Sequence, residues 1–161
     1  MDDYRTAGAA RYITARIQRI RMEAVSRSTK TALQFTHTGS SYSYGSYMDG
    51  NGDGVRTMDI RDGIDRPLGA IERLSDNFSG VEFGLLPGLP PVERGSAPPG
   101  IDPIKLGVSN ILSYSATGSS TSGSLYLLGR ARAQYVVRIF GDTGRTRTLR
   151  FDPDAGRWRP L

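Results

Sequence analysis

The sequence predicts an α+β fold, in which one long N-terminal α-helix packs on antiparallel β-sheet. Three observations lead to this prediction. Apolar residues recur every three or four positions near the start, strand-like segments fill the rest, and 20 glycines and nine prolines separate them. A chain of 161 residues with 37% hydrophobic and 23% charged residues is typical of one globular domain, so we assign residues 1–161 to a single domain.

Residues 1–28 are predicted to form an amphipathic helix. The segment contains no proline, and its two early aspartates suit the positive end of a helix dipole. Arg27 and Lys30 suit the negative end. The apolar residues lie at the three- and four-residue steps that place them on one face of a helix: Ala10, Ile13, Ile17, Ile20 and Ala24.

Residues 29–161 are predicted to be rich in β-structure. A segment with six prolines and four glycines, 84–103, can be neither helix nor central strand, so we expect a long surface loop. GDTG at 141–144 is predicted to be a hairpin turn, and the turn at 152–156 leaves Trp158 to dock near the C-terminus. The predicted strands are 29–38, 40–48, 55–60, 81–85, 105–112, 123–128, 133–140 and 145–151.

The composition excludes several kinds of active site. The chain has no cysteine and a single histidine, His37, so it forms no disulfide, no thiolate zinc site and no multi-histidine metal site. The same inventory gives no support to a triad with a histidine base, and His37, at the end of a predicted strand, is interpreted as structural. We find no phosphate-binding glycine motif and expect a protein that is not an enzyme.

Asp142-Thr143-Gly144 has the form of an aspartic-protease motif. Such enzymes place two carboxylates together so that they share a proton. The chain has no second copy, and the neighbouring Arg145 would stabilise the ionised carboxylate and oppose that sharing. The hairpin turn accounts for the same residues, so the motif is not interpreted as catalytic.

Charge is unevenly distributed along the chain. Residues 1–30 carry seven basic and three acidic groups, residues 31–129 six and ten, and residues 130–161 eight and three. The basic ends suit nucleic acid or an anionic surface, although a solvated charged face is the commoner cause. No apolar run is long enough to span a bilayer, so the sequence predicts a soluble chain.

The run DGNGDG at residues 49–54 has the first half of a calcium-loop pattern. Asp49, Asn51 and Asp53 supply oxygen ligands at alternating positions, and a glycine follows where an EF-hand requires one. Ile60 occupies the position of the bidentate glutamate, so the pattern is not an EF-hand. We predict a glycine-rich turn between two strands, with a looser calcium loop as the alternative.

Arginines gather on the last predicted hairpin and form a candidate nucleic-acid site. Arg145 and Arg147 project to one face of a strand with a two-residue step that suits successive phosphates, and Arg150 extends the set. Tyr135 and Trp158 could offer stacking surfaces nearby. The alternative is a charged face that protects a strand edge from pairing with another chain.

The order of these features resembles the GspH/FimT family of type II secretion pseudopilins and minor type IV pilins. Three stretches carry the resemblance: ARIQRIRMEAVSRSTKTALQF, DGNGDG and GSLYLLGRARAQYVVRIFGDTGRTRTLRFDPDAGRW. Family members close the helix with an arginine-x-x-alanine-x-x-arginine motif, which Arg21, Ala24 and Arg27 match. The loop 84–103 is the part without a counterpart.

The resemblance implies a pilin-like fold and a function in assembly. Family precursors carry a leader that is cleaved, a methylated first residue and about 20 apolar residues that continue the helix into the inner membrane. The chain would then be a periplasmic domain, with Met1 added for expression. Its partners would be other pseudopilin or pilin subunits, or DNA in minor pilins of the FimT kind, and no small-molecule substrate is expected.

Overall fold

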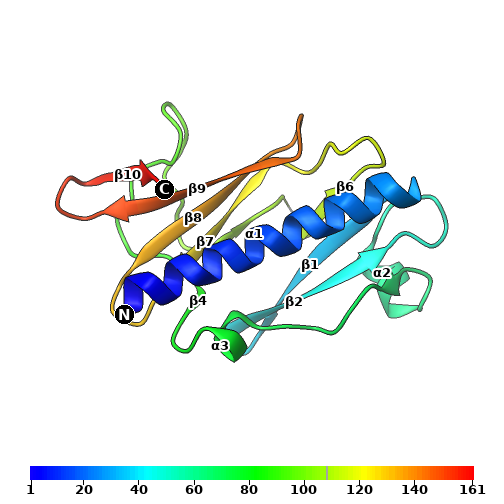
Figure 1. Ribbon diagram of the computed structural model, residues 1–161, viewed down its shortest axis with the longest axis horizontal. Coiled ribbons are helices and arrows are strands. Elements are labelled where there is room, and N and C mark those ends of the chain that lie inside the picture. Colours follow the sequence, from blue (N-terminus) through cyan, green and yellow to red (C-terminus); the bar gives the residue numbers. More distant parts are fainter. Residues whose placement is uncertain (108) are drawn as a thin grey trace.

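Helix α1 (Asp2–Arg27) runs along one side of the molecule (Figure 1). The computed structural model describes residues 1–107 and 109–161. At 1.5 Å per residue, the 26 residues of α1 extend over about 39 Å. The helix ends at Ser28, which has a left-handed backbone (φ 51°), and the amide of Thr29 donates to the carbonyl of Ala24. This geometry satisfies the free carbonyls of the last turn.

The strands form two antiparallel sheets. The four-stranded sheet has the order β3-β2-β1-β6, with β1 at Thr31–Thr38, β2 at Ser41–Met48, β3 at Arg66–Pro67 and β6 at Ile111–Tyr114. The six-stranded sheet has the order β10-β9-β8-β7-β4, and β5 also pairs with β7. Its strands are β4 (Glu82–Phe83), β5 (Ile104–Lys105), β7 (Gly123–Leu128), β8 (Gln134–Phe140), β9 (Arg145–Asp152) and β10 (Arg157–Pro160).

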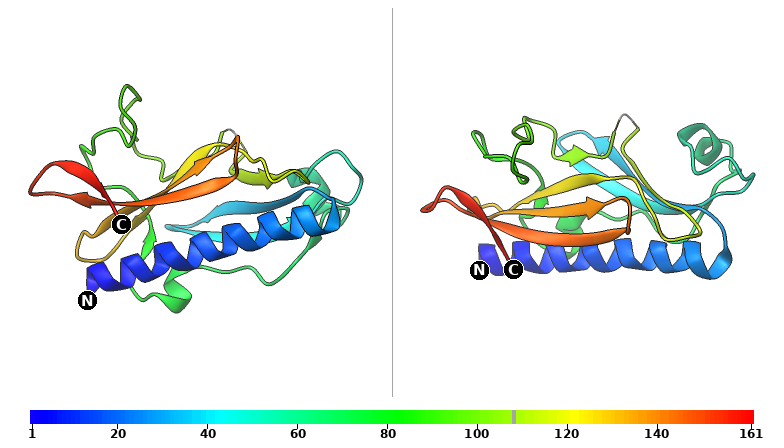
Figure 2. Two further views of the ribbon diagram at one scale, coloured as in Figure 1. Left: turned by 45° about the horizontal axis from the view of Figure 1, so that its top comes forward. Right: turned by 90° about the horizontal axis from the view of Figure 1, so that it is seen from above.

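Both sheets lie on the same side of α1 and share one core with it (Figure 2). The predicted apolar face of the helix is buried, with Ile13 and Ile17 fully enclosed. Leu33 and Phe35 of β1 meet it from one sheet, and Tyr135 of β8 from the other, where these side chains belong to the same cluster. The helix therefore links the two sheets, because each sheet buries one of its faces against it.

Two segments outside the sheets cover parts of their outer faces. Helix α2 (Thr57–Arg61) follows Val55, which packs with Tyr47 on the outer face of the four-stranded sheet. The loop 84–103 crosses the outer face of the six-stranded sheet and contains no helix or strand, as predicted. Its Val92 packs beside Tyr126 and Trp158. Each sheet thus buries one face against α1 and part of its other face under one of these segments. The small helix α3 (Leu74–Asn77) lies between β3 and β4.

Most predicted elements are confirmed, and two are wrong. The strand predicted at 55–60 is instead a buried valine followed by α2, so the DGNGDG turn joins a strand to a helix rather than two strands. The strand predicted at 105–112 is two strands in different sheets, β5 and β6, and position 108 lies outside the described residues. Trp158 docks as expected, but within a further strand, β10, that pairs with β9.

Candidate functional site

The outer face of α1 carries exposed apolar residues. Tyr4, Ala15, Met22 and Val25 lie within about 80° of one another when the helix is projected down its axis, opposite the buried isoleucines. Arg11 and Gln18 lie in the same sector, between them. The exposed fractions of Tyr4, Met22 and Val25 are 76%, 71% and 50%. We call the four apolar residues the α1 outer stripe. These exposed apolar side chains are available for contacts with another protein.

The glycine-rich turn at 49–54 is folded around two buried aspartates. Asp49 accepts hydrogen bonds from the backbone amides of Asn51, Gly52 and Gly54, at 2.9–3.2 Å. Asp65, which follows α2 in the chain, accepts hydrogen bonds from the backbone amides of Gly50 and Arg56, at 2.9 and 2.8 Å. Both carboxylates are therefore used to hold the backbone of the turn, since amide donors satisfy an ionised carboxylate well.

The predicted calcium ligands do not converge on one point. Asn51 and Asp53 are exposed, and the amide group of Asn51 donates to Asp59 of α2 at 3.3 Å. Desolvation and the nearby Asp53 and Asp65 raise the pKa of the Asp59 carboxyl. Among residues 1–107 and 109–161, no group of three or more acidic or histidine side chains is arranged to hold a metal ion. Calcium binding by Asp49, Asn51 and Asp53 stays a prediction.

Arg145 and Arg147 lie together on the outer face of β9. Both are exposed, and neither forms an ion pair with any described residue. Arg138 of β8 stands opposite Arg147 in the register, but its guanidinium donates to Glu93 of the loop at 2.6 Å. Its charge is therefore already compensated. Two free cations, about 7 Å apart along the strand, remain on this face.

The other members of the predicted nucleic-acid site lie elsewhere. Arg150 is on the opposite face of β9, where its guanidinium lies 3.6 Å from the carboxylate of Asp3 on α1. Tyr135 faces the same way, is 1% exposed and donates its hydroxyl to Asp3. Trp158 is half-buried, and its indole donates to the carbonyl of Pro90. The structure thus brings Arg145 and Arg147 together and places Arg150 and Tyr135 on the opposite face of the sheet. Trp158 is on the same face as the two arginines but farther along, opposite Phe151.

The remaining motif residues have structural surroundings. Asp142 and Thr143 form an exposed turn between β8 and β9. Gly144 closes it with φ of 69°, and its backbone amide donates a hydrogen bond to the carbonyl of Phe140. His37 is exposed near the end of β1, where its ring stacks on Tyr42 at 4.7 Å between centroids. Among the described residues, no hydrogen bond joins the Asp142 carboxyl to a second carboxyl group.

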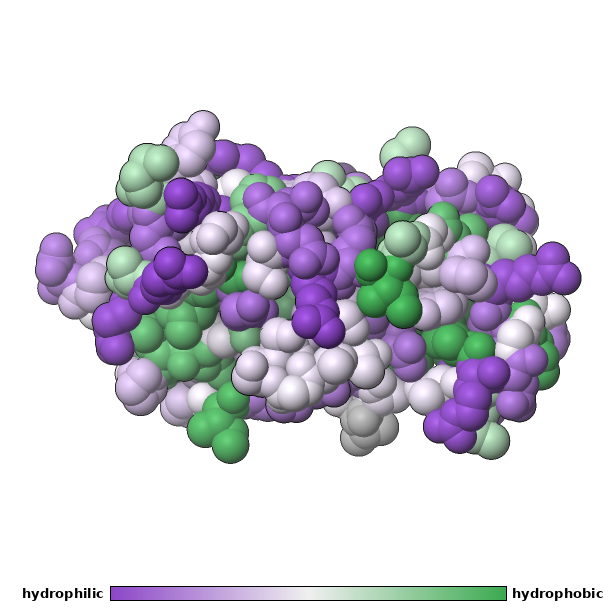
Figure 3. All heavy atoms as spheres, turned by 90° about the horizontal axis from the view of Figure 1, so that it is seen from below, coloured by the Kyte–Doolittle hydropathy of each residue, from purple (hydrophilic) through white to green (hydrophobic). Residues whose placement is uncertain are grey.

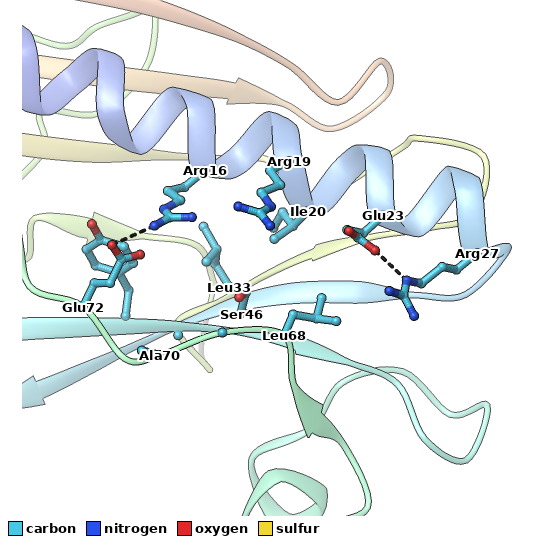
Figure 4. Close-up of a pocket in the computed structure, with 13 residues that line it drawn as sticks. Arg16, Arg19, Ile20, Glu23, Arg27, Leu33, Ser46, Leu68, Ala70 and Glu72 are labelled. Carbon is cyan, nitrogen blue, oxygen red and sulfur yellow. Dashed lines mark hydrogen bonds and ion pairs between the residues drawn. The ribbon is translucent and has the colours of Figure 1, made fainter.

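A pocket of about 350 Å³ lies between α1 and β2, and no sequence motif marks it (Figure 4). We call it the α1–β2 pocket. Besides α1 and β2, the segment that follows β3 also lines the pocket. Residues from three distant parts of the sequence line it, among them Arg16, Arg19 and Ile20 of α1, Tyr44 and Ser46 of β2, and Leu68.

A bulge in the sheet opens this pocket. Pro67 is opposite Tyr47 in the register, whereas Glu72 is opposite Tyr44. Two residues of β2 therefore face the four residues 68–71 of the neighbouring segment, which bends away and leaves room beside the helix. Bulges of this kind often border binding sites.

Arg19 lies at the centre of the pocket, between two ion pairs at its ends (Figure 4). At one end Arg16 donates to Glu72 at 3.0 Å, and Tyr12 donates to the same carboxylate. At the other end Arg27 donates to Glu23 at 2.5 Å. Figure 4 shows the Arg19 guanidinium between these pairs, directed towards the strands. Within the described chain Arg19 has no ion pair and no hydrogen bond from its side chain.

Two further donors of the pocket are buried without partners. The hydroxyl of Tyr44 and the Nε of Arg16 are both enclosed, and neither has a hydrogen-bond partner among the described residues. Burial, with Glu72 nearby, raises the pKa of the Tyr44 hydroxyl strongly, so that it is a neutral donor at physiological pH. Buried donors without partners are rare in folded proteins, because each costs free energy.

The structure contains no helix with both the length and the apolar character needed to cross a bilayer, within residues 1–107 and 109–161. No protein-family model, no curated protein and no solved structure matches this chain.

Proposed function

We propose that this chain is the globular part of a minor pseudopilin or pilin, a structural subunit that acts by assembling into a short filament of a secretion or pilus system. The α1 outer stripe is the observation that carries the proposal. A helix that buries one face in its own domain and exposes Tyr4, Met22 and Val25 on the other can pack against the helix of a neighbouring subunit.

The overall organisation also supports a subunit of this kind. Helix α1 spans about 39 Å, a length that offers an extended face to the helix of a neighbouring subunit. The sheets cover only one side of α1 (Figure 2). The inner-membrane and periplasmic location is part of the same proposal, because a filament rooted in that membrane would place the β-rich domain outside the bilayer.

The coding sequence upstream of Asp2 gives the simplest test. The proposal expects a short basic leader, a prepilin cleavage site and about 20 apolar residues in frame with α1. An unrelated domain or a polar segment in that position would exclude a pilin-like subunit.

Disulfide cross-linking tests the helix contact directly, because the chain has no cysteine of its own. Met22→Cys, in the parent protein expressed with partner subunits that carry a cysteine on the facing side of their own helix, is expected to give cross-linked dimers under mild oxidation, which joins the two thiols. Ile101→Cys is the matched control, since Ile101 is 96% exposed in the loop of the opposite sheet face. Equal cross-linking of the two variants would show that α1 is not a preferred contact.

A second candidate function is DNA binding by the same subunit, favoured by the free Arg145 and Arg147 on the outer face of β9. Non-specific DNA binding relies on such contacts to successive phosphates and weakens steeply with salt. The arrangement of the two side chains, rather than the total charge of the chain, is what supports this candidate.

The expected result is that Arg145→Gln/Arg147→Gln weakens binding to duplex DNA and reduces the slope of log affinity against log salt by about 2. Arg150→Gln is the control, because Arg150 faces α1 and pairs with Asp3. Fluorescence anisotropy at several salt concentrations measures both. Retained affinity in the double variant, or equal loss in the control, would exclude this face of β9.

A further inference from the structure

The α1–β2 pocket presents hydrogen-bond donors that the chain itself does not satisfy. Arg19 is exposed and has no side-chain partner among the described residues, and the enclosed hydroxyl of Tyr44 and Nε of Arg16 have none either. Ser46 adds a hydroxyl that forms no hydrogen bond within the described chain. A site that offers several donors and few free acceptors is suited to a ligand that brings acceptors, above all an anion.

The charges around the pocket favour a monoanion. Three arginines and two glutamates line it, and both glutamates are already paired with arginines, so one positive charge remains, on Arg19. A carboxylate supplies one negative charge and a planar pair of acceptors that matches the guanidinium. A phosphate dianion would be only half neutralised.

The remaining walls are apolar and limit the size of the ligand. Ile20, Leu33, Leu68 and Ala70 contribute hydrocarbon surface, and glycines without side chains stand at 45 and 69. The volume of about 350 Å³ is at the small end of the range for ligand sites. An anionic group with a short branched or linear hydrocarbon body fits these limits.

We propose that the α1–β2 pocket binds a monocarboxylate with a short apolar body. Arg19 pairs with the carboxylate, the Tyr44 hydroxyl donates to it, and the hydrocarbon part packs on Ile20 and Leu68. The carboxylate belongs either to a free small acid or to the C-terminus of a peptide, since both present the same group. This binding goes beyond the proposed filament contact, because Arg19 is not one of the four residues of the α1 outer stripe.

Titration with isocaproate, followed by NMR amide shifts, tests the proposal. The expected result is saturable binding with shifts confined to the lining of the pocket, and at least tenfold weaker binding of the neutral isostere isocaproamide. Arg19→Gln is expected to weaken isocaproate binding about tenfold, the usual value of one charged hydrogen bond. Arg5→Gln, an exposed arginine at the other end of α1, is expected to bind as the wild type does.

Tyr44→Phe separates a binding role from a structural one. Because its hydroxyl is buried without a partner, removal is expected to leave the melting temperature of the ligand-free protein unchanged or raised, while isocaproate binds about fivefold more weakly. Equal binding of acid and amide, undiminished binding in Arg19→Gln, or no saturable binding would each overturn the proposal. N-acetyl-leucine identifies the source: tighter binding than isocaproate assigns the pocket to a peptide C-terminus, and weaker binding to a free acid.

Discussion

Single buried polar residues hold neighbouring segments of this molecule in place. Gln134 is the clearest case, at 1% exposed. Its amide nitrogen donates to the carbonyls of Gly84, Leu127 and Tyr135, and its oxygen accepts from the amide of Leu86. One side chain thus fixes the beginning of the loop 84–103 to the six-stranded sheet, because every donor and acceptor is satisfied only when the loop is in place.

Gln134→Leu is expected to lower the free energy of unfolding by about 2–4 kcal/mol, because it leaves the amide of Leu86 and buried carbonyls without partners. Chemical denaturation measures the change. Gln34→Leu is the control: Gln34 makes one exposed hydrogen bond, to Thr57, and its replacement is expected to change stability by about 0.5 kcal/mol or less. A loss in Gln134→Leu no larger than in the control would contradict the importance of this side chain.

At the scale of elements, the β9–β10 hairpin depends on polar contacts more than on its core. Strand β10 contributes one half-buried apolar side chain, Trp158, which packs on Tyr126 and Phe151. The turn is closed by Asp152, which accepts from Arg159 at 2.6 Å and from the amides of Asp154 and Ala155. These contacts, led by the hydrogen bond from Arg159, lower the pKa of the Asp152 carboxyl.

Acid is therefore expected to loosen this hairpin. Because the folded pKa of this carboxyl is lowered, its ionised form stabilises the hairpin at pH values above the ordinary pKa of 3.8. This stabilisation is lost as the pH falls through the lower pKa of the folded state. Trp158 is the single tryptophan, so its fluorescence reports on β10 alone. We expect a red shift of its emission below about pH 4.

Asp152→Asn should show part of that shift already at neutral pH, because the amide cannot replace the charged acceptor of Arg159. Asp142→Asn, in the exposed turn of the other hairpin, is the matched control and should behave as the wild type does. An emission spectrum that stays constant from pH 7 to pH 2 in the wild type would contradict the expectation.

At the scale of the whole molecule, α1 and both sheets form one core in which tyrosines are prominent. Tyr44, Tyr114 and Tyr135 are fully buried, and Tyr126 is nearly so. Burial raises the pKa of each hydroxyl, and for Tyr135, which also donates to Asp3, the value rises to about 12. On the side of the molecule shown in Figure 3, the surface outside this core carries small hydrophobic patches between hydrophilic groups.

The core is accordingly expected to lose stability in alkali. A raised tyrosine pKa means that the unfolded chain releases its protons first, so the stabilisation is complete below pH 10 and declines as pH rises towards 12. Denaturation midpoints at pH 8 and pH 11 measure the effect. Tyr135→Phe should reduce the slope of stability with pH, whereas Tyr4→Phe, which alters an exposed ring, should not. An unchanged midpoint at pH 11 would contradict the prediction.

The two candidate binding regions differ in how much of them the sequence could predict. Arg145 and Arg147 are two residues apart on one strand, so alternation alone places them on the same face. Alternation could also have separated Arg150 from them, since it is an odd number of residues away. The ion pair between Arg138 and Glu93 could not be predicted from the sequence, because it depends on where the loop 84–103 crosses the sheet.

The sequence by itself determined the long helix, its buried face, the first two strands, the proline-rich loop and the C-terminal hairpin, because these follow from local periodicity and turn chemistry. Tertiary structure decided the rest. The residues after DGNGDG became α2 because Asp49 and Asp65 hold their backbone in place of a strand partner. The α1–β2 pocket arises only where a helix, a strand and a bulged segment meet, and such contacts between distant residues leave no local pattern in the chain.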